Sequence, residues 1–478
     1  MPLQKNQVLT LRVERLSSDG SGVAHSPDGE TVFIPGAAPG DEARVRIVKD
    51  CKRYAFGILD EVLTPSPDRI PVDCAVAGPC GGCSLRHLDY AAELRAKQEN
   101  VADAFARIGG LDVPVLPIVG SPEVNRYRNK VQFPVGVDKS GKPCIGFYAG
   151  RTHRIVPCPD CRLQPGVLNE IGNALCAFFA EKGIQPYSEE TGRGFVRHIF
   201  LRRGAHSGQI MVCLVCTRAK LPSAEELCTR LKAQFAEITT ILLNVNAKNT
   251  NVILGTETHT LYGPGYIEDT LCGVPVQLGP LSFYQVNTLA AEQLYGIAAQ
   301  YAQLTPDDLL LDLYCGMGTI GLSMAAHCRE LIGVEIVPEA IESAKANAAR
   351  MGADVAAKSR FFCADAGQAA TRLAAEGLHP DIVMLDPPRK GCDEATLSAV
   401  VHMSPRRVVY VSCNPATAAR DAAWLEQNGY HAEKVQPVDL FPRTRHCETV
   451  VLLSKGEIDS KKVRVEFSLE DMDMSGFQ

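Results

Sequence analysis

The sequence predicts an α/β fold with a doubly wound, mainly parallel sheet for its C-terminal part, preceded by an OB-like β-barrel and an α+β segment. From about residue 288 onward, apolar runs alternate with helical patterns, which is typical of a parallel sheet that binds ligands at the carboxyl ends of its strands. Residues 7–62 instead alternate apolar and polar positions in short runs broken by Gly, Pro and Asp, as small barrels do. Residues 113–262 mix strand and helix patterns, which favours an α+β arrangement.

The elements of the first half follow from local patterns. Strands of the barrel are expected at "VLTLRVERL", "TVFIPG", "ARVRIV" and "YAFGILDEVL", and the proline-rich "LTPSPDRIP" (63–71) is expected to be a stiff linker. A cysteine-bearing loop spans 74–89. The helix expected at about 90–108 ends at two glycines and presents one apolar face, formed by Leu94, Val101, Phe105 and Ile108.

The second half begins after the boundary stretch 263–287. A helix is expected at about 288–303, and the following strands are "LLLDLY", "ELIGVEI", "SRFFCAD", "DIVMLD", "RVVYVS" and "HCETVVLLSK", with helices between them. Apolar residues alternate at 463, 465, 467 and 469, which fits either a further strand or a loose tail. The expected domains are therefore 1–63, 64–270 and 271–455, with a C-terminal tail at 456–478.

Composition describes an ordinary globular chain. The 478 residues are 46% hydrophobic and 22% charged, and this length predicts more than one domain. The start lacks the apolar core of a signal peptide, and no apolar run approaches the roughly 20 residues that cross a bilayer. We therefore expect a cytoplasmic protein without a membrane span. In that reducing compartment, the 18 cysteines are expected to be buried residues, metal ligands or catalytic thiols rather than disulfides.

The net charge of −6 does not by itself indicate a nucleic-acid-binding protein. Three local patches, at 43–53, 125–130 and 197–203, nevertheless cluster Arg and Lys, in part among aromatic residues. This composition suits phosphate contact and base stacking. Solvated strand edges would explain each patch about equally well.

A glycine-rich loop in "LLLDLYCGMGTIGLSMA" predicts a cofactor site. Asp312 ends a strand, Gly316, Gly318 and Gly321 allow a tight turn, and Glu335 ends the next strand, where it could accept hydrogen bonds from a ribose. The spacing fits a dinucleotide, S-adenosyl-L-methionine or a purely structural turn. A pyrophosphate favours a helix N-terminus directly over it, whereas the acidic Asp312 suits the sulfonium and amino-acid end of S-adenosylmethionine.

Three further residues could carry chemistry at the same sheet edge. Asp386 ends a buried strand and enters the rigid Pro-Pro turn of "DPPRKG", where it is either a site carboxylate or the N-cap of a helix. Cys413 follows "VVYVS" and precedes a helix, a position that favours a thiolate below the free pKa of about 8.5. Glu448 is either a proton acceptor or an ion-pair partner of Arg443 or Arg445.

Methylation of a pyrimidine carbon requires this set of groups. Carbon 5 of uracil is a weak nucleophile until a thiolate adds to carbon 6 and turns the ring into an enolate. A base must then remove the hydrogen at carbon 5 so that the thiolate can leave. Cys413, Glu448 and a methyl donor in the glycine-rich loop would supply the three functions.

Six motifs now identify a resemblance. "CAVAGPCGGC", "FYQVN", "DLYCGMGTIGL", "DPPRKG", "VSCNPAT" and "HCETVVLL" resemble, from about residue 5 to 455, the bacterial 23S rRNA (uracil-5-)-methyltransferases with an N-terminal TRAM domain, relatives of the tRNA enzymes. The resemblance implies that the barrel is TRAM and that the α/β part is a Rossmann-like methyltransferase domain. It implies that Cys413 is the nucleophile, Glu448 the base, and Asp386 a neighbour of both cofactor and uracil. With the loop residues, the cofactor contacts would be Gln285, Asp312, Tyr314, Gly316, Gly318, Thr319, Glu335, Asp365 and Asp386.

The resemblance also implies a 4Fe-4S cluster in the central domain. Its ligands would be Cys74, Cys80, Cys83 and Cys161. The sequence departs from the family pattern at Cys158, which creates a second CxxC motif. Cys80, Cys83, Cys158 and Cys161 could instead bind zinc, which would leave Cys74 spare.

The sequence thus predicts an enzyme that flips a uridine out of folded 23S rRNA and methylates its carbon 5 with S-adenosylmethionine. We expect a monomer. A tRNA substrate keeps the same chemistry. A dinucleotide-dependent oxidoreductase using the glycine-rich loop and a noncatalytic RNA-binding protein are alternatives from other classes.

Overall fold

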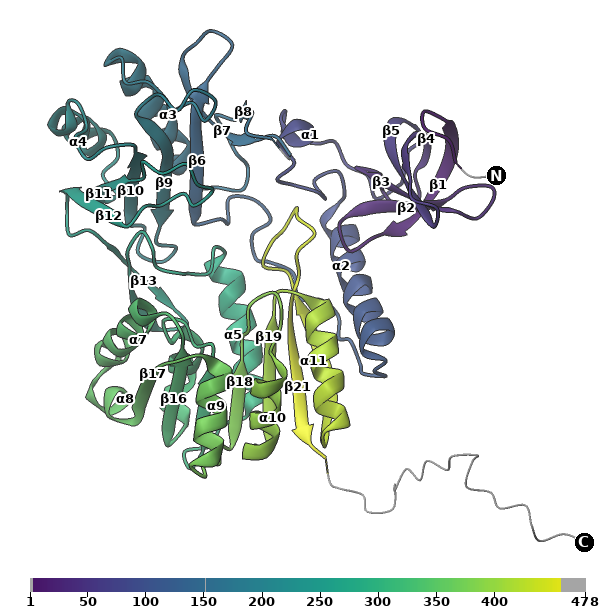
Figure 1. Ribbon diagram of the computed structural model, residues 1–478, viewed down its shortest axis with the longest axis vertical. Coiled ribbons are helices and arrows are strands. Elements are labelled where there is room, and N and C mark those ends of the chain that lie inside the picture. The colour runs from purple at the N-terminus through teal and green to yellow at the C-terminus, as the bar shows by residue number, and fades with distance from the viewer. Residues whose placement is uncertain (1–2, 151, 457–478) are drawn as a thin grey trace, which may run out of the picture.

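The computed structural model describes residues 3–150 and 152–456, and Figure 1 shows their arrangement. All but the first residue of the expected C-terminal tail, 456–478, lies outside the described residues. The chain forms a small barrel, a central sheet with its helices, and a C-terminal sheet with helices on both faces. No helix among the described residues is long and apolar enough to cross a membrane.

The barrel is built by five strands that close in the order β1-β2-β3-β5-β4. Alternate residues such as Leu11, Val13, Val45 and Ile47 point into its core and are fully or almost fully buried. The closure pairs β3 with β5 in parallel, whereas the other contacts are antiparallel. The strands are β1 (Val8–Leu16), β2 (Ser21–His25), β3 (Thr31–Pro35), β4 (Glu42–Asp50) and β5 (Tyr54–Thr64).

The central part is a seven-stranded sheet in the order β12-β11-β10-β9-β6-β7-β8, with helices α3 (Gly166–Glu181) and α4 (Ala224–Gln234). Phe133, Leu168, Phe179 and Leu214 are buried in its core. The strands are β6 (Lys130–Val137), β7 (Pro143–Tyr148), β8 (Ile155–Pro157), β9 (Val196–Arg203), β10 (Ile210–Cys216), β11 (Ile238–Val245) and β12 (Glu257–Tyr262).

One of the predicted basic patches is part of this core. Arg197 is 4% exposed and Arg202 is 1% exposed in β9. Arg197 donates to the carbonyl oxygens of residues 246 and 248, and Arg202 donates to those of Gly279 and Ser282. The interpretation of 197–203 as an RNA-contact patch or a solvated edge is therefore wrong for these two residues, because their guanidinium groups are used to hold loops inside the protein.

The C-terminal sheet has the order β17-β16-β15-β18-β19-β21-β20. The first five strands are parallel, and β21 runs antiparallel between β19 and β20. The sequence does not predict strand β20. Its segment "YHAEKVQPV" lies at the sheet edge, and it contains exposed polar residues instead of a continuous apolar run. The strands are β15 (Leu309–Leu313), β16 (Glu330–Glu335), β17 (Ser359–Cys363), β18 (Ile382–Leu385), β19 (Arg407–Ser412), β20 (Tyr430–Val438) and β21 (Glu448–Lys455).

Helices and a hairpin bury both faces of this sheet. Leu310 and Met384 belong to one buried cluster and Leu311 and Leu385 to another, as expected for alternate residues of a doubly covered sheet. The first face carries α5 and the hairpin β13–β14. The elements are β13 (Ile267–Leu271), β14 (Val274–Leu278), α5 (Thr288–Ala302), α6 (Thr319–Met324), η2 (Ala325–His327), α7 (Pro338–Met351), α8 (Ala353–Lys358), α9 (Ala366–Ala375), α10 (Glu394–Met403) and α11 (Pro415–Gln427).

A helix from the first half of the chain completes the second face. The short α1 (Ala77–Cys80) precedes α2 (Tyr90–Ala104), which continues as one π-helical turn, η1 (Phe105–Gly109). Val101 and Phe105 pack in the same buried cluster as Ala418 of α11, and Figure 1 shows α2 alongside α11. Ile108 is 57% exposed, so the predicted apolar face ends at the π-turn. The N-terminal half therefore contributes directly to the C-terminal core.

Candidate active site

Strand register brings Cys413 and Glu448 together. Ser412 at the end of β19 pairs with Thr449 in the antiparallel neighbour β21. Ser412–Thr449 is the last pair of this register; Cys413 directly follows Ser412, and Glu448 directly precedes Thr449. The Glu448 charge acts on the Cys413 thiol, so the two side chains lie near each other at this edge. Asp386 directly follows β18, the parallel neighbour of β19 on its other side. Three residues from distant motifs therefore meet at one sheet edge.

Cys413 lies in front of the first turn of α11. Asn414 caps this helix, because its side chain accepts a hydrogen bond from the Ala416 amide at 3.2 Å, and Pro415 occupies the first helical position. Burial raises the pKa of the Cys413 thiol, and the Glu448 carboxylate raises it further, while Arg389 acts in the opposite direction. The predicted lowering of this pKa is therefore wrong for the protein without substrate, because burial and a facing carboxylate outweigh the helix N-terminus.

Glu448 is a buried carboxyl group. It is 6% exposed, and burial together with the Asp386 charge raises its pKa to about 8, against the effect of Arg389. Arg443 lies 3.6 Å from Glu93, and among the described residues no ion pair joins Glu448 to Arg443 or Arg445. The structure thus removes the ion-pair alternative and leaves a carboxyl group poised to exchange a proton near neutral pH.

Asp386 lies between the glycine-rich loop and the thiol. Burial raises its pKa to about 7. Its charge contributes to the raised pKa of Asp312 on one side and to those of Cys413 and Glu448 on the other. The N-cap alternative is not borne out, because α10 is capped by Asp393, whose side chain accepts a hydrogen bond from the Thr396 amide.

The glycine-rich loop is folded around two carboxylates. Glu335 accepts the Gly316 amide at 3.1 Å and the amides of residues 336 and 337 at 2.9 and 3.0 Å. Asp312 accepts the Gly321 amide at 3.0 Å through one oxygen, and its other oxygen is buried without a hydrogen-bond partner. Gly316 and Gly318 have φ values of +54° and +79°, which glycine adopts without strain. An acidic cradle with an unpartnered oxygen fits the cationic end of S-adenosylmethionine.

The remaining predicted cofactor residues lie around this loop. Tyr314 has a φ of +66°, and its hydroxyl lies 3.3 Å from the Thr396 hydroxyl. Thr319 lies 3.3 Å from the Tyr295 hydroxyl, which the Gln285 side chain also contacts. Asp365 caps α9 by accepting the Gln368 amide at 3.1 Å. Asp312 and Glu335 lie at the carboxyl ends of β15 and β16, and Asp365 and Asp386 follow β17 and β18, at the edge where parallel sheets bind ligands.

A cavity of about 630 Å³ leads from Cys413 to the barrel. In it, Arg389 Nη2 lies 3.3 Å from His446 Nδ1. Burial and Arg389 lower the pKa of His446 to about 4, so its neutral ring accepts this hydrogen bond. Sequence reasoning missed both residues, although Arg389 is part of "DPPRKG" and His446 of "HCETVVLL". The barrel and α2 complete the walls with Arg15, Ser17, Asp19, His25, Phe33, Lys97, Asn100 and Arg107.

Three of the four predicted cluster ligands share a second cavity. Cys80, Cys83 and Cys161 line a space of about 240 Å³ in the central part. Cys74 lies outside this lining but within electrostatic range of Cys80. Among the described residues, no group of three or more His, Cys, Asp or Glu side chains forms a site that could hold a metal ion. The predicted metal site is thus not formed in this structure.

The surroundings nevertheless suit an anionic group. Arg86 is 3% exposed and donates to Asp73 at 2.7 Å and to Asn125 at 3.1 Å. Burial raises the pKa of the Cys83 thiol, whereas a hydrogen bond with the Arg86 guanidinium and the charge of that group lower it. Cys158 shares a hydrogen bond with Cys161 and is itself buried. The cysteine thiols and the buried guanidinium beside Cys83 fit a thiolate-bound cluster in their chemistry.

Comparisons with known proteins agree with this geometry. Residues 207–456 match the family model described as tRNA (uracil-5-)-methyltransferase, and residues 2–59 match the TRAM domain. An RNA methyltransferase of Halalkalibacterium halodurans is 43% identical over 453 residues, covering 95% of this chain and 98% of the relative. One of Clostridium tetani is 40% identical over 454 residues with the same coverage.

A solved structure extends the similarity to the fold. The crystal structure of Pyrococcus abyssi tRNA (uracil-54, C5)-methyltransferase in complex with S-adenosyl-L-homocysteine is 27% identical. It covers 94% of this chain and 100% of its own, with a TM-score of 0.74.

Proposed function

This chain belongs to the tRNA (uracil-5-)-methyltransferase family and begins with a TRAM domain, and from that premise we propose that it methylates carbon 5 of a uridine in 23S rRNA. It is an RNA methyltransferase that uses S-adenosylmethionine. The family membership sets aside the oxidoreductase and the noncatalytic RNA-binding protein. The observation that carries the proposed mechanism is that Cys413 and Glu448 lie at the same ends of the paired strands β19 and β21, close enough for the Glu448 charge to act on the thiol.

In the proposed mechanism, Cys413 gives its proton to solvent, and the resulting thiolate sulfur bonds to carbon 6 of the uracil. The electron pair of the carbon 5–carbon 6 double bond moves to form an enolate, which makes carbon 5 nucleophilic. S-adenosylmethionine, when bound, supplies an electrophilic methyl group to that carbon. Glu448 then accepts the proton from carbon 5, the double bond re-forms, and the carbon–sulfur bond breaks with its electron pair returning to sulfur.

In this proposal, the residues of the site have different roles in binding the donor, orienting the reactants and favouring the thiolate. The carboxylates of Asp312, Glu335 and Asp365 and the backbone of the glycine-rich loop would hold the donor, together with Gln285 and Thr319. Asp386 would orient both the donor and the uracil, because its charge reaches both groups of residues. Arg389 counteracts the raised pKa of Cys413 and therefore favours the thiolate.

The substrate choice rests on the motif resemblance, which includes the four cysteines. The tRNA alternative is favoured by the Pyrococcus abyssi structure, whose substrate is a tRNA uracil. Methyl transfer from labelled donor to 23S rRNA and to tRNA transcripts separates the two. Transfer to rRNA alone supports the proposal, and transfer to tRNA alone contradicts it.

Covalent trapping tests the mechanism. RNA with 5-fluorouridine has no hydrogen at carbon 5, so the proposed base has nothing to remove, and we expect a stable conjugate at Cys413 in the presence of donor. Cys413→Ala should abolish both conjugate and methyl transfer. Cys228→Ala, at a half-buried cysteine of α4 far along the chain, is the matched control and should behave as wild type.

We also propose a 4Fe-4S cluster on Cys74, Cys80, Cys83 and Cys161. Support comes from the cavity that three of these thiols share and from the buried guanidinium of Arg86 beside Cys83. Anaerobic purification followed by iron and sulfide analysis tests this. Zinc without sulfide would instead favour a site that includes Cys158.

We further propose that the enzyme acts in the cytoplasm as a monomer. All 18 cysteines are free thiols in the structure, as a reducing compartment would keep them. Sedimentation of the purified protein tests the oligomeric state.

A further inference from the structure

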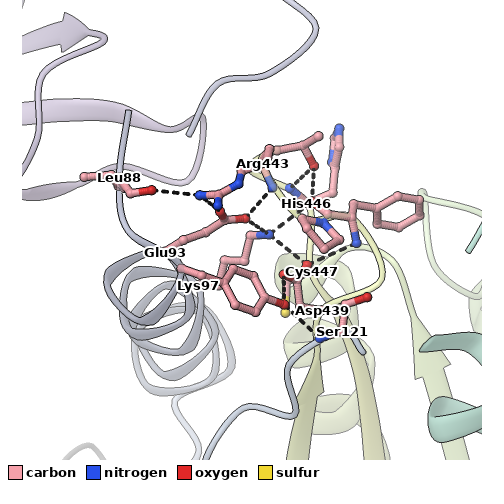
Figure 2. A network of polar contacts seen from close by, with 12 residues as sticks. Leu88, Glu93, Lys97, Ser121, Asp439, Arg443, His446 and Cys447 are labelled. Atoms are coloured by element: carbon pink, nitrogen blue, oxygen red, sulfur yellow. Dashed lines mark hydrogen bonds and ion pairs between the residues drawn. The ribbon is translucent and has the colours of Figure 1, made fainter. Parts of the chain in front are cut away.

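The loop before Glu448 is held by an unusual set of buried charges. This loop, Asp439–Cys447, joins β20 to β21 and is called the base loop here because it ends one residue before Glu448. Asp439 is fully buried and Arg443 is 9% exposed. Figure 2 shows that their partners Glu93 and Lys97 come from α2, more than 300 positions earlier in the chain.

Lys97 is the centre of this network. It is 2% exposed, and its Nζ atom donates to Glu93 Oε1 at 2.8 Å, to Asp439 Oδ1 at 2.8 Å and to the carbonyl oxygen of Phe441 at 3.2 Å. The three donors of the ammonium group are thus all used, and two of them hold the base loop. Burial lowers the pKa of Lys97, but the carboxylates of Asp439 and Glu93 more than offset this, so the group stays charged.

Glu93 fixes the strained turn of the base loop. Arg443 has a φ of +69°, a left-handed conformation that is unfavourable for residues other than glycine. Its amide donates to Glu93 Oε1 at 2.7 Å, and its Nη1 atom donates to the Leu88 carbonyl at 2.8 Å. The helix therefore holds the loop in a shape that its own backbone does not favour.

Other segments of the enzyme also bind the base loop. Tyr90 donates to Asp439 at 2.9 Å, and Tyr127 donates to the carbonyl of Pro442 at 3.0 Å. Asn287, in the "FYQVN" motif, donates to the carbonyl of Leu440 at 3.0 Å. The loop is thereby connected to α2, to the segment before β6 and to the segment that carries Gln285.

Stability alone is a weak reason for such a network. Well-packed apolar residues often stabilise a protein as much as buried ion pairs, since desolvating the charges is costly. Buried charges with directional partners do, however, fix one geometry. The pairing Val438 with Glu448 places the base at the end of the held loop, and Lys97 itself lines the cavity that contains Cys413.

We propose that Lys97 is a positioning residue, which acts through Asp439 and the base loop to hold the Glu448 carboxylate where it meets the proton on carbon 5. This inference rests on the proposed roles of Cys413 and Glu448. In the affected step the carbon 5–hydrogen bond breaks, the proton goes to Glu448, the double bond re-forms, and the sulfur leaves with its electron pair. Addition of Cys413 and methyl transfer precede this step and do not need the base.

A single-turnover experiment separates the steps. RNA tritiated at carbon 5 of uridine is mixed with excess enzyme and methyl-labelled donor, and methyl transfer, tritium release and covalent RNA adduct on denaturing gels are followed. For Lys97→Met we expect methyl transfer within about threefold of wild type, tritium release slowed at least tenfold, and accumulation of adduct. Lys97→Arg should restore most of the release. Lys345→Met, at an exposed lysine of α7, is the matched control.

The outcomes distinguish positioning from stability. Glu93→Gln and Asp439→Asn keep the shape of the network, and every folded variant of the three must slow release more than methyl transfer. Equal loss of both, or unchanged release, overturns the inference, and so does failure of all three variants to fold. If wild type itself releases no tritium, or Cys413→Ala still forms adduct, the proposed function fails instead.

Discussion

Arg389 Nη2 lies 3.3 Å from His446 Nδ1, and this contact lies in the cavity that opens onto Cys413. The carbonyl oxygen of Arg389 accepts the Asn414 side chain at 3.0 Å, so "DPPRKG" is joined to the start of α11. The same guanidinium opposes the raised pKa values of Cys413 and Glu448. The charge of Arg389 therefore acts on the nucleophile Cys413, on the proposed base Glu448 and on His446.

Removal of this charge should slow the reaction at neutral pH. Without Arg389, the pKa values of Cys413 and Glu448 rise further, so fewer molecules hold a thiolate at pH 7. For Arg389→Met we expect kcat/KM at pH 7 to fall by about tenfold to a hundredfold, with part of the loss recovered at pH 9. Arg372→Met on the exposed side of α9 is the control. Equal loss at both pH values would contradict this role.

Activity of the wild-type enzyme should rise with pH across the neutral range. The thiol of Cys413 has a raised pKa, and Glu448, with a pKa of about 8, must be deprotonated to accept a proton. Both requirements are better met as pH increases from 6 to 8.5. The measurement is kcat/KM against pH with saturating donor. A profile that is flat or falls over this interval would exclude a rate limited by these two groups.

Glu448→Gln should stabilise the protein at alkaline pH. A carboxyl group whose pKa is raised on folding binds a proton more tightly in the folded state, so it costs no stability below the unfolded pKa of about 4.3. The loss in free energy of unfolding that Glu448 causes grows as pH rises and reaches its full size above the folded pKa of about 8. We expect the free energy of unfolding of Glu448→Gln to exceed that of wild type by up to about 5 kcal/mol at pH 9.

Urea unfolding of both proteins at pH 5 and pH 9 measures this difference. The two proteins should differ by only about 1 kcal/mol at pH 5, because Glu448 is protonated in the folded wild type and pH 5 is just above the unfolded pKa. A difference of the same size at both pH values would mean that the carboxyl group is not the cause.

The segment that carries Gln285 should depend on Arg202. The guanidinium of Arg202 donates at 2.7 Å to both Gly279 and Ser282. Its loss leaves two carbonyl groups unpaired and lets the segment move, so for Arg202→Met we expect the Kd for S-adenosylhomocysteine to rise about tenfold. Calorimetric titration of wild type, Arg202→Met and the exposed Arg218→Met measures it. An unchanged Kd would show that the segment is held by its other contacts, such as Asn129.

Periodicity was sufficient to predict the parallel part of the fold and the sheet edge that carries Asp312, Glu335 and Asp386. The motifs around Cys413 and Glu448 identified the catalytic candidates, but the pairing of β19 with β21, which cannot be read from the sequence, brings them to the same sheet edge. The raised pKa of Cys413 depends on burial by the assembled protein and could not be predicted locally.

Long-range pairings explain the other differences. Arg202 has the composition of an RNA contact, yet it is buried, because its partners lie in a loop almost 80 positions away. Lys97 and Glu93 look like an ordinary i, i+4 pair on a solvated helix face until Asp439 is brought beside them. Neither partner can be recognised by local spacing.

Helix α2 and the π-helical turn η1 that continues it place Val101 and Phe105 in the core beneath α11. During synthesis, these side chains leave the ribosome long before Ala418 is made. The core between α2 and α11 can therefore form only when synthesis is almost finished. An exchange of gene segments that replaced residues 90–109 without the C-terminal half would leave mismatched apolar surfaces on both sides. We therefore expect residues 90–109 and the C-terminal half to have been inherited together, although the barrel and the central sheet form distinct structural units.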